Sequence, residues 1–69
     1  MNRKEFDSLS IEKQLDYING KLKAGLTVTE TCKQIGIGRS TMTDRAKKIG
    51  KKYNSKYNQY IKINNDDSN

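Results

Sequence analysis

Hydrophobic residues recur at helical spacing in three separate stretches of the chain. In the first stretch the apolar positions lie four, three and four residues apart: Ile11, Leu15, Ile18 and Leu22. This spacing places them on one face of a helix. Ser10 belongs to the residue types that cap helix N-termini, and Gly25 suits the position after the last turn. We therefore predict a helix over residues 11–24.

Two shorter amphipathic helices are predicted within residues 27–49, with a tight turn between them. Thr27 and Glu30 have the spacing of a capping box, in which each side chain bonds the backbone amide of the other residue. The apolar positions are Val28, Cys32 and Ile35 in one helix, and Met42, Ala46 and Ile49 in the next. Gly36 can adopt the left-handed conformation that the turn requires, and Ile37 is expected to enter the core.

The pattern changes after Gly50, where tyrosines and isoleucines alternate with turn-forming residues. This composition predicts a β-hairpin with strands near residues 51–54 and 59–63, and a fourth helix from about Asn54 is the alternative. Residues 1–9 form an N-terminal arm or a short helix, in which Phe6 covers the core. Residues 64–69 are expected to be a disordered acidic tail. The predicted fold over residues 10–63 is mainly α, a three-helix bundle with a C-terminal hairpin wing.

Composition excludes several classes of protein. A chain of 69 residues with 32% hydrophobic residues is expected to be one domain, or a piece of one, with a small core. It has no apolar run long enough for a membrane span and no signal-peptide pattern. One cysteine and no histidine leave no metal-ligand spacing and no Cys/His pair. We therefore expect neither an enzyme nor a metal or cofactor site, and we expect Cys32 to be buried.

The charge is distributed unevenly along the chain. Residues 1–30 contain five basic and five acidic residues, whereas residues 31–62 contain nine basic residues and one acidic residue, Asp44. Solubility alone does not require that the positive charges collect in one half. A field of one sign attracts a polyanion such as nucleic acid.

A known pattern occurs within the basic half, at residues 35–42, IGIGRSTM. It resembles the helix-turn-helix at the DNA-binding end of resolvases and DNA invertases, with a small residue at Cys32, the turn glycine at Gly36 and core residues at Ile37 and Met42. The chain also looks like small helix-turn-helix domains of Firmicutes phages and plasmids. It lacks the catalytic domain of the recombinases, and it has Thr43 and Asp44 where they usually have a tyrosine and a basic residue.

The resemblance implies that the second helix of the motif, residues 39–49, lies in the major groove of DNA. Arg39 could bond guanine in a bidentate manner, and Asp44 could accept from cytosine or pair with Lys48. The expected base-contacting residues are Arg39, Ser40, Thr41, Thr43, Asp44 and Lys47. The expected phosphate contacts are Thr27, Thr29, Lys33, Lys48, Lys51, Lys52 and Lys56.

These observations predict sequence-specific binding of double-stranded DNA by a transcriptional regulator of a phage, plasmid or bacterial operon. The alternatives are a part of a plasmid or phage replication or partition system, or a non-catalytic adapter that binds protein or RNA. Three C-terminal tyrosines favour RNA, because aromatic rings stack on bases. The expected partners are DNA and a second copy of the chain, or the rest of a longer oligomerising chain, in a cytoplasmic, nucleoid-associated setting. No membrane or small-molecule ligand is expected.

Overall fold

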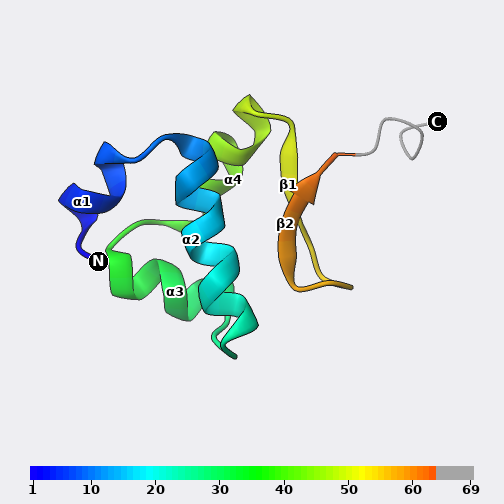
Figure 1. The fold of residues 1–69 in the computed structure, drawn as a ribbon, viewed down its shortest axis with the longest axis horizontal. Helices are drawn as coiled ribbons and strands as arrows, with labels where there is room; N and C mark the ends of the chain where they lie inside the picture. The colour runs from blue at the N-terminus through cyan, green and yellow to red at the C-terminus, as the bar shows by residue number, and fades with distance from the viewer. Residues whose placement is uncertain (64–69) are drawn as a thin grey trace.

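The computed structural model describes residues 1–63, which form four helices and a two-stranded antiparallel sheet. The predicted tail, residues 64–69, lies outside this range. The elements follow one another as α1 (Arg3–Ser8), α2 (Ile11–Lys23), α3 (Val28–Ile35), α4 (Arg39–Lys48), β1 (Lys51–Asn54) and β2 (Gln59–Lys62) (Figure 1). None of these helices is long and apolar enough to cross a membrane.

Capping contacts confirm the predicted starts of α2 and α3 and the predicted end of α3. The Ser10 hydroxyl accepts a hydrogen bond from the backbone amide of Lys13 at the start of α2. Thr27 and Glu30 form the reciprocal capping box at the start of α3. Gly36 ends α3 with a φ of 88°, a left-handed conformation that a side chain would strain. Local sequence therefore sets where these helices begin and where α3 ends.

Residues 1–9 contain a short helix, one of the two predicted alternatives. Asn2 and Glu5 form a capping box at the start of α1. Phe6 is fully buried, and its ring packs edge-to-face against Tyr17 of α2. The N-terminal segment is therefore a structural part of the bundle.

The core contains or contacts the apolar residues that the periodicity predicts, with Ile11 partly buried against it and with one exception. Leu15, Ile18, Val28, Cys32 and others form one buried cluster. The exception is Ile49, which is 38% exposed. This residue caps the C-terminus of α4 with a φ of −112° and lies outside the helix, so the helical spacing no longer sets the direction of its side chain.

The segment after Gly50 is a β-hairpin, as predicted, and the alternative of a fourth helix from Asn54 is wrong. Tyr53 is paired with Tyr60 across the two strands, and their rings pack edge-to-face. In the turn, the Asn54 side chain accepts hydrogen bonds from two backbone amides, and Asn58 takes a φ of 51°. Asparagine tolerates this left-handed conformation better than most residues, which explains its use at this position.

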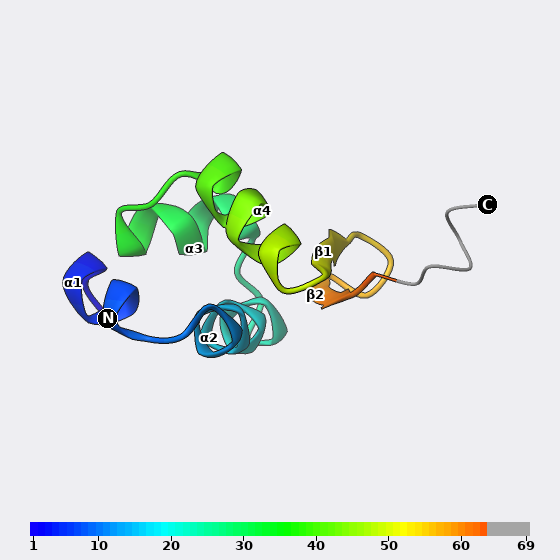
Figure 2. The ribbon, with the colours of Figure 1, turned by 90° about the horizontal axis from the view of Figure 1, so that it is seen from above.

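Asn19 of α2 joins the hairpin to the bundle. Its side-chain amide donates to the carbonyl oxygen of Tyr60 at 3.0 Å and accepts from the Tyr60 amide at 2.7 Å. In this way it satisfies both backbone groups of Tyr60, as a neighbouring strand would. Figure 2 shows the outcome: α3 and α4 lie on one side of the bundle, α1 and α2 lie on the other, and the hairpin follows the end of α4.

Candidate functional site

One face of α4 consists entirely of exposed polar side chains. Met42 and Ala46 are fully buried, and they fix the rotation of the helix about its axis. The opposite face carries four of the predicted base-contacting residues, all exposed: Ser40, Thr43, Asp44 and Lys47. Thr41 is half-buried. The structure thus brings most of the predicted contact residues together on one surface.

Two of these side chains have hydrogen-bonding states that the sequence did not specify. The Thr43 hydroxyl donates to the backbone carbonyl of Arg39 at 3.1 Å, so its lone pairs remain as acceptors. Asp44 was predicted either to contact cytosine or to pair with Lys48. Within residues 1–63 the ion pairs involve Asp7 with Arg3 and with Arg45, so the pair between Asp44 and Lys48 is not formed. The Asp44 carboxylate therefore remains available on the exposed face.

Arg45 holds α4 against the rest of the bundle. Its guanidinium donates to a carboxylate oxygen of Asp7 and to the side-chain oxygen of Gln14, both at 3.0 Å. Gln14 is buried, and its amide nitrogen donates to the carbonyl oxygens of Phe6 and Leu9. The hydrogen bond from Arg45 is the main cause that lowers the pKa of Asp7 from its ordinary value. This network connects α1, α2 and α4.

The turn between α3 and α4 is held by a second arginine. Arg3 donates to the carbonyl oxygen of Gly36 at 2.9 Å and to the Asp7 carboxylate at 2.8 Å. The Gly36 carbonyl follows the last turn of α3, where backbone acceptors lack helical partners. Asp7 therefore connects the arginine that holds the turn with the arginine that holds α4.

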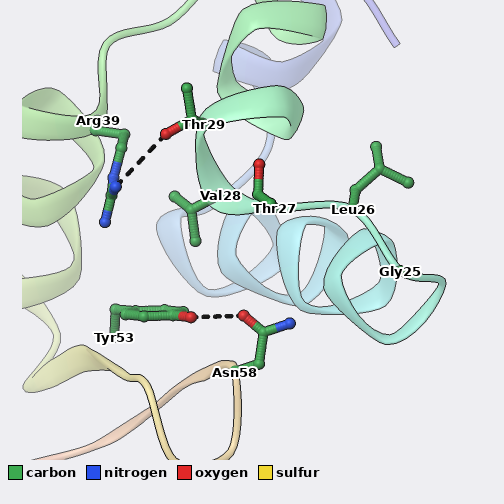
Figure 3. Close-up of a pocket in the computed structure, with 8 residues that line it drawn as sticks. All are labelled: Gly25, Leu26, Thr27, Val28, Thr29, Arg39, Tyr53 and Asn58. Carbon is green, nitrogen blue, oxygen red and sulfur yellow. Dashed lines mark hydrogen bonds between the residues drawn. The ribbon is translucent and has the colours of Figure 1, made fainter.

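The N-terminal end of α4 borders a pocket of about 280 Å³. Figure 3 shows Arg39 reaching toward the first turn of α3 and the hairpin. Its guanidinium lies 3.5 Å from the Thr29 hydroxyl, a long and weak hydrogen bond. On the hairpin side of the pocket, the Tyr53 hydroxyl donates to the side-chain oxygen of Asn58. The lining residues are Gly25, Leu26, Thr27, Val28, Thr29, Arg39, Tyr53 and Asn58.

The predicted phosphate-contacting lysines are largely exposed. Lys33, Lys48, Lys52 and Lys56 are exposed, and Lys51 is half-buried. Lys51 lies directly opposite Lys62 in the hairpin. Like charges at opposed positions of two strands destabilise a sheet, and an anion bound nearby would relieve this repulsion. The lysines of the described segment form no ion pair with a carboxylate.

Sequence reasoning did not identify Tyr53 and Asn58 as site residues, nor the supporting roles of Gln14 and Asn19. Tyr53 carried the signal of a strand residue and Asn58 that of a turn residue, and neither signal indicates a pocket. Comparisons with protein-family models, curated proteins and solved structures found no match for the chain. The arrangement itself offers a polar helix face, lysines without a carboxylate partner among residues 1–63, and a pocket with an arginine.

Proposed function

We propose that this protein binds double-stranded DNA sequence-specifically, with α4 in the major groove, and that it regulates transcription of a phage, plasmid or bacterial operon. The observation that carries the proposal is the pairing of a rigid inner face with an open outer face on α4. Met42, Ala46 and Arg45 fix the helix from behind, while Ser40 and Lys47 are exposed on the other side.

The connection between α3 and α4 supports a helix-turn-helix assignment. Gly36 has the left-handed conformation of the turn, and Ile37 is 6% exposed. In helix-turn-helix proteins the second helix enters the major groove and the first crosses the DNA backbone. α4 and α3 take these roles here, and the hairpin corresponds to a wing beside the second helix.

The charge of the chain supports a polyanionic partner. The formal net charge is +6, and residues 31–62 contain nine of the fourteen basic residues. Arg45 is neutralised by Asp7, whereas the lysines on α4 and the hairpin lack carboxylate partners within the described segment. Lysines of this kind contact phosphates and position the protein without specifying sequence.

The division of roles follows from the exposed surfaces. Ser40, Thr43, Asp44 and Lys47 contact base edges, and the half-buried Thr41 lies at the edge of this group. Lys33, Lys48, Lys51, Lys52 and Lys56 contact the phosphates, with Thr27 and Thr29 at the start of α3. Arg39 was predicted to contact a base, and its position beside Thr29 gives it a second possible partner, a phosphate.

RNA binding through stacked tyrosines is the less favoured alternative. Tyr60 is 4% exposed, and Tyr53 packs against it. Tyr57 remains 61% exposed, with the Lys56 amine 5.7 Å from its ring centre. A single exposed ring does not provide the platform of several aromatic side chains on which single strands stack.

The test is selection of bound sequences from a random duplex pool, followed by titration of the selected duplex, a scrambled duplex and a single-stranded RNA at two salt concentrations. We expect a preferred duplex sequence and a logarithmic salt slope of about −0.9 for each phosphate contacted. A palindromic preferred site would also indicate a dimer. Absence of duplex binding at low salt, or equal affinity for all sequences, would contradict the proposal.

A further inference from the structure

The pocket between α3, α4 and the hairpin has a chemical character of its own. Its walls carry a guanidinium, two threonine hydroxyls, a phenol and a side-chain amide, and no carboxylate lines it. The Glu30 carboxylate accepts a hydrogen bond from the backbone amide of Thr27, so it lies beside one wall of the pocket without being among the lining residues. A cation and several donors without a carboxylate are suited to an oxyanion.

Arg39 is the charged group of this pocket, and the protein satisfies it poorly. Its one hydrogen bond to another side chain is the 3.5 Å contact with the Thr29 hydroxyl. Neither ion pair of the described segment involves Arg39. A guanidinium has five N–H donors in a planar fork that matches phosphate oxygens. Most of its bonding capacity is therefore left for a ligand.

Donors on the other walls complete the site. The Thr27 hydroxyl accepts from the Glu30 amide, and the Thr29 hydroxyl accepts from Arg39, so both can still donate their hydrogen. The Tyr53 hydroxyl donates to the side-chain oxygen of Asn58, and Figure 3 shows the Asn58 nitrogen turned away from Arg39, so this amide is not one of the donors around the guanidinium. The volume of about 280 Å³ is sufficient for an oxyanion, since about 10–15 Å³ of such water-accessible space already holds one water molecule.

We propose that this pocket binds one phosphate group, with the Arg39 guanidinium as its principal ligand and the Thr27 and Thr29 hydroxyls as further donors. This inference rests on the proposed DNA binding, because the phosphate is taken to be one phosphodiester of the bound duplex. Arg39 then positions the protein on the backbone, and sequence discrimination falls to the exposed face of α4.

The experiment uses the full chain and the selected duplex with a single neutral methylphosphonate placed at each backbone position in turn. At the phosphate that Arg39 contacts, the neutral group should lower wild-type affinity roughly tenfold, the equivalent of one charge-assisted hydrogen-bonded contact. The Arg39→Gln variant should bind the unmodified duplex roughly tenfold more weakly, with unchanged base preference, and should lose its sensitivity at that position.

Lys13→Gln is the matched control, because it removes a charge from the exposed surface of α2 outside the pocket. Its affinity and its methylphosphonate profile should equal those of the wild type apart from a small uniform loss. If Arg39→Gln instead relaxes the preference at one base pair and keeps the wild-type methylphosphonate profile, Arg39 contacts a base. That result would overturn the pocket proposal.

Failure of the proposed function gives a different result, namely no duplex binding by the wild type. In that case the pocket is tested by NMR titration with inorganic phosphate against chloride at equal ionic strength. Shifts of the Val28 and Thr29 amides with phosphate that vanish in Arg39→Gln would support the pocket as a site for a free phosphorylated ligand. No difference between the two salts would overturn it.

Discussion

The two arginines of α4 lie in opposite chemical situations. Arg45 has its partners inside the protein, a carboxylate of Asp7 and the side-chain oxygen of Gln14. Arg39, near the other end of the same helix, has a single long contact with Thr29. The described segment contains no buried side-chain polar atom without a hydrogen-bond partner. Among the described residues, incomplete pairing is thus confined to side-chain atoms that water can reach.

This difference separates residues that stabilise the fold from residues to which we assign binding. A buried donor or acceptor that loses its partner is costly, whereas an exposed guanidinium remains solvated by water. Changes around Gln14 should therefore affect the free energy of unfolding, and changes at the pocket should affect binding while leaving the fold intact.

The largest effect is expected at Gln14. Gln14→Leu keeps the approximate size of the side chain but leaves the Phe6 and Leu9 carbonyl oxygens and Arg45 without their partner. Urea unfolding followed by circular dichroism should show a loss of about 2–4 kcal/mol. Lys13→Gln, at the exposed neighbouring position, should change stability by less than about 0.5 kcal/mol. Equal effects of the two changes would contradict the structural role of Gln14.

A smaller effect distinguishes the two arginines directly. Arg45→Gln should lower the free energy of unfolding by about 1–2 kcal/mol, because it removes the donor to Asp7 and Gln14. Arg39→Gln should leave it within about 0.5 kcal/mol of the wild-type value. Thermal and urea unfolding of both variants provide the measurement. A large destabilisation by Arg39→Gln would mean that the pocket is a structural element.

The smallest effect is the pH dependence of stability at Asp7, because this carboxylate lies near the surface. Its pKa is lowered from the ordinary value of 3.8, first by the hydrogen bond from Arg45. A carboxyl whose pKa is lower in the folded state stabilises the fold above its unfolded pKa. This contribution is lost as the pH falls from about 3.8 through the folded pKa.

Urea midpoints of the wild type and Asp7→Asn measured between neutral and strongly acidic pH would test this contribution. The wild type should be the more stable at neutral pH, and the difference should disappear under acidic conditions. Hydrogen bonds with Thr27 also lower the pKa of Glu30. Its protonation therefore lowers the stability of the wild type and of Asp7→Asn alike, and it does not affect the difference between them. In an Arg45→Gln background the effect of Asp7→Asn should shrink, since the main cause of the shift is gone.

Local signals in the sequence sufficed to predict most of the elements. These signals are the spacing of Leu15, Ile18 and Leu22, the cap at Thr27 and the turn glycine Gly36. Each acts between residues within one or two helical turns, so it can be recognised in the sequence alone. The turn-forming asparagines likewise identified the hairpin. Ile49 was misplaced because the spacing argument was extended past the end of α4, where helical geometry stops.

The contacts that assemble the elements could not be predicted, because they join distant positions. Gln14 and Arg45 are 31 residues apart, Asp7 and Arg45 are 38 apart, and Asn19 and Tyr60 are 41 apart. Nothing in the composition selects these pairs among the many polar residues of the chain. The pocket is unpredictable for the same reason, since Thr29, Arg39 and Asn58 meet only after α3, α4 and the hairpin have packed together.

The rate at which a reagent labels Cys32 can be used to measure local opening of the fold. Cys32 is the single cysteine of the chain, and it lies on the buried face of α3, where it is 2% exposed. Burial raises the pKa of its thiol. Thiolate is the reactive form, so an alkylating reagent modifies Cys32 only when α3 transiently separates from the bundle. The rate of labelling therefore reports how often the proposed binding surface opens, without any introduced probe. A bound partner that stabilises this region should lower the labelling rate.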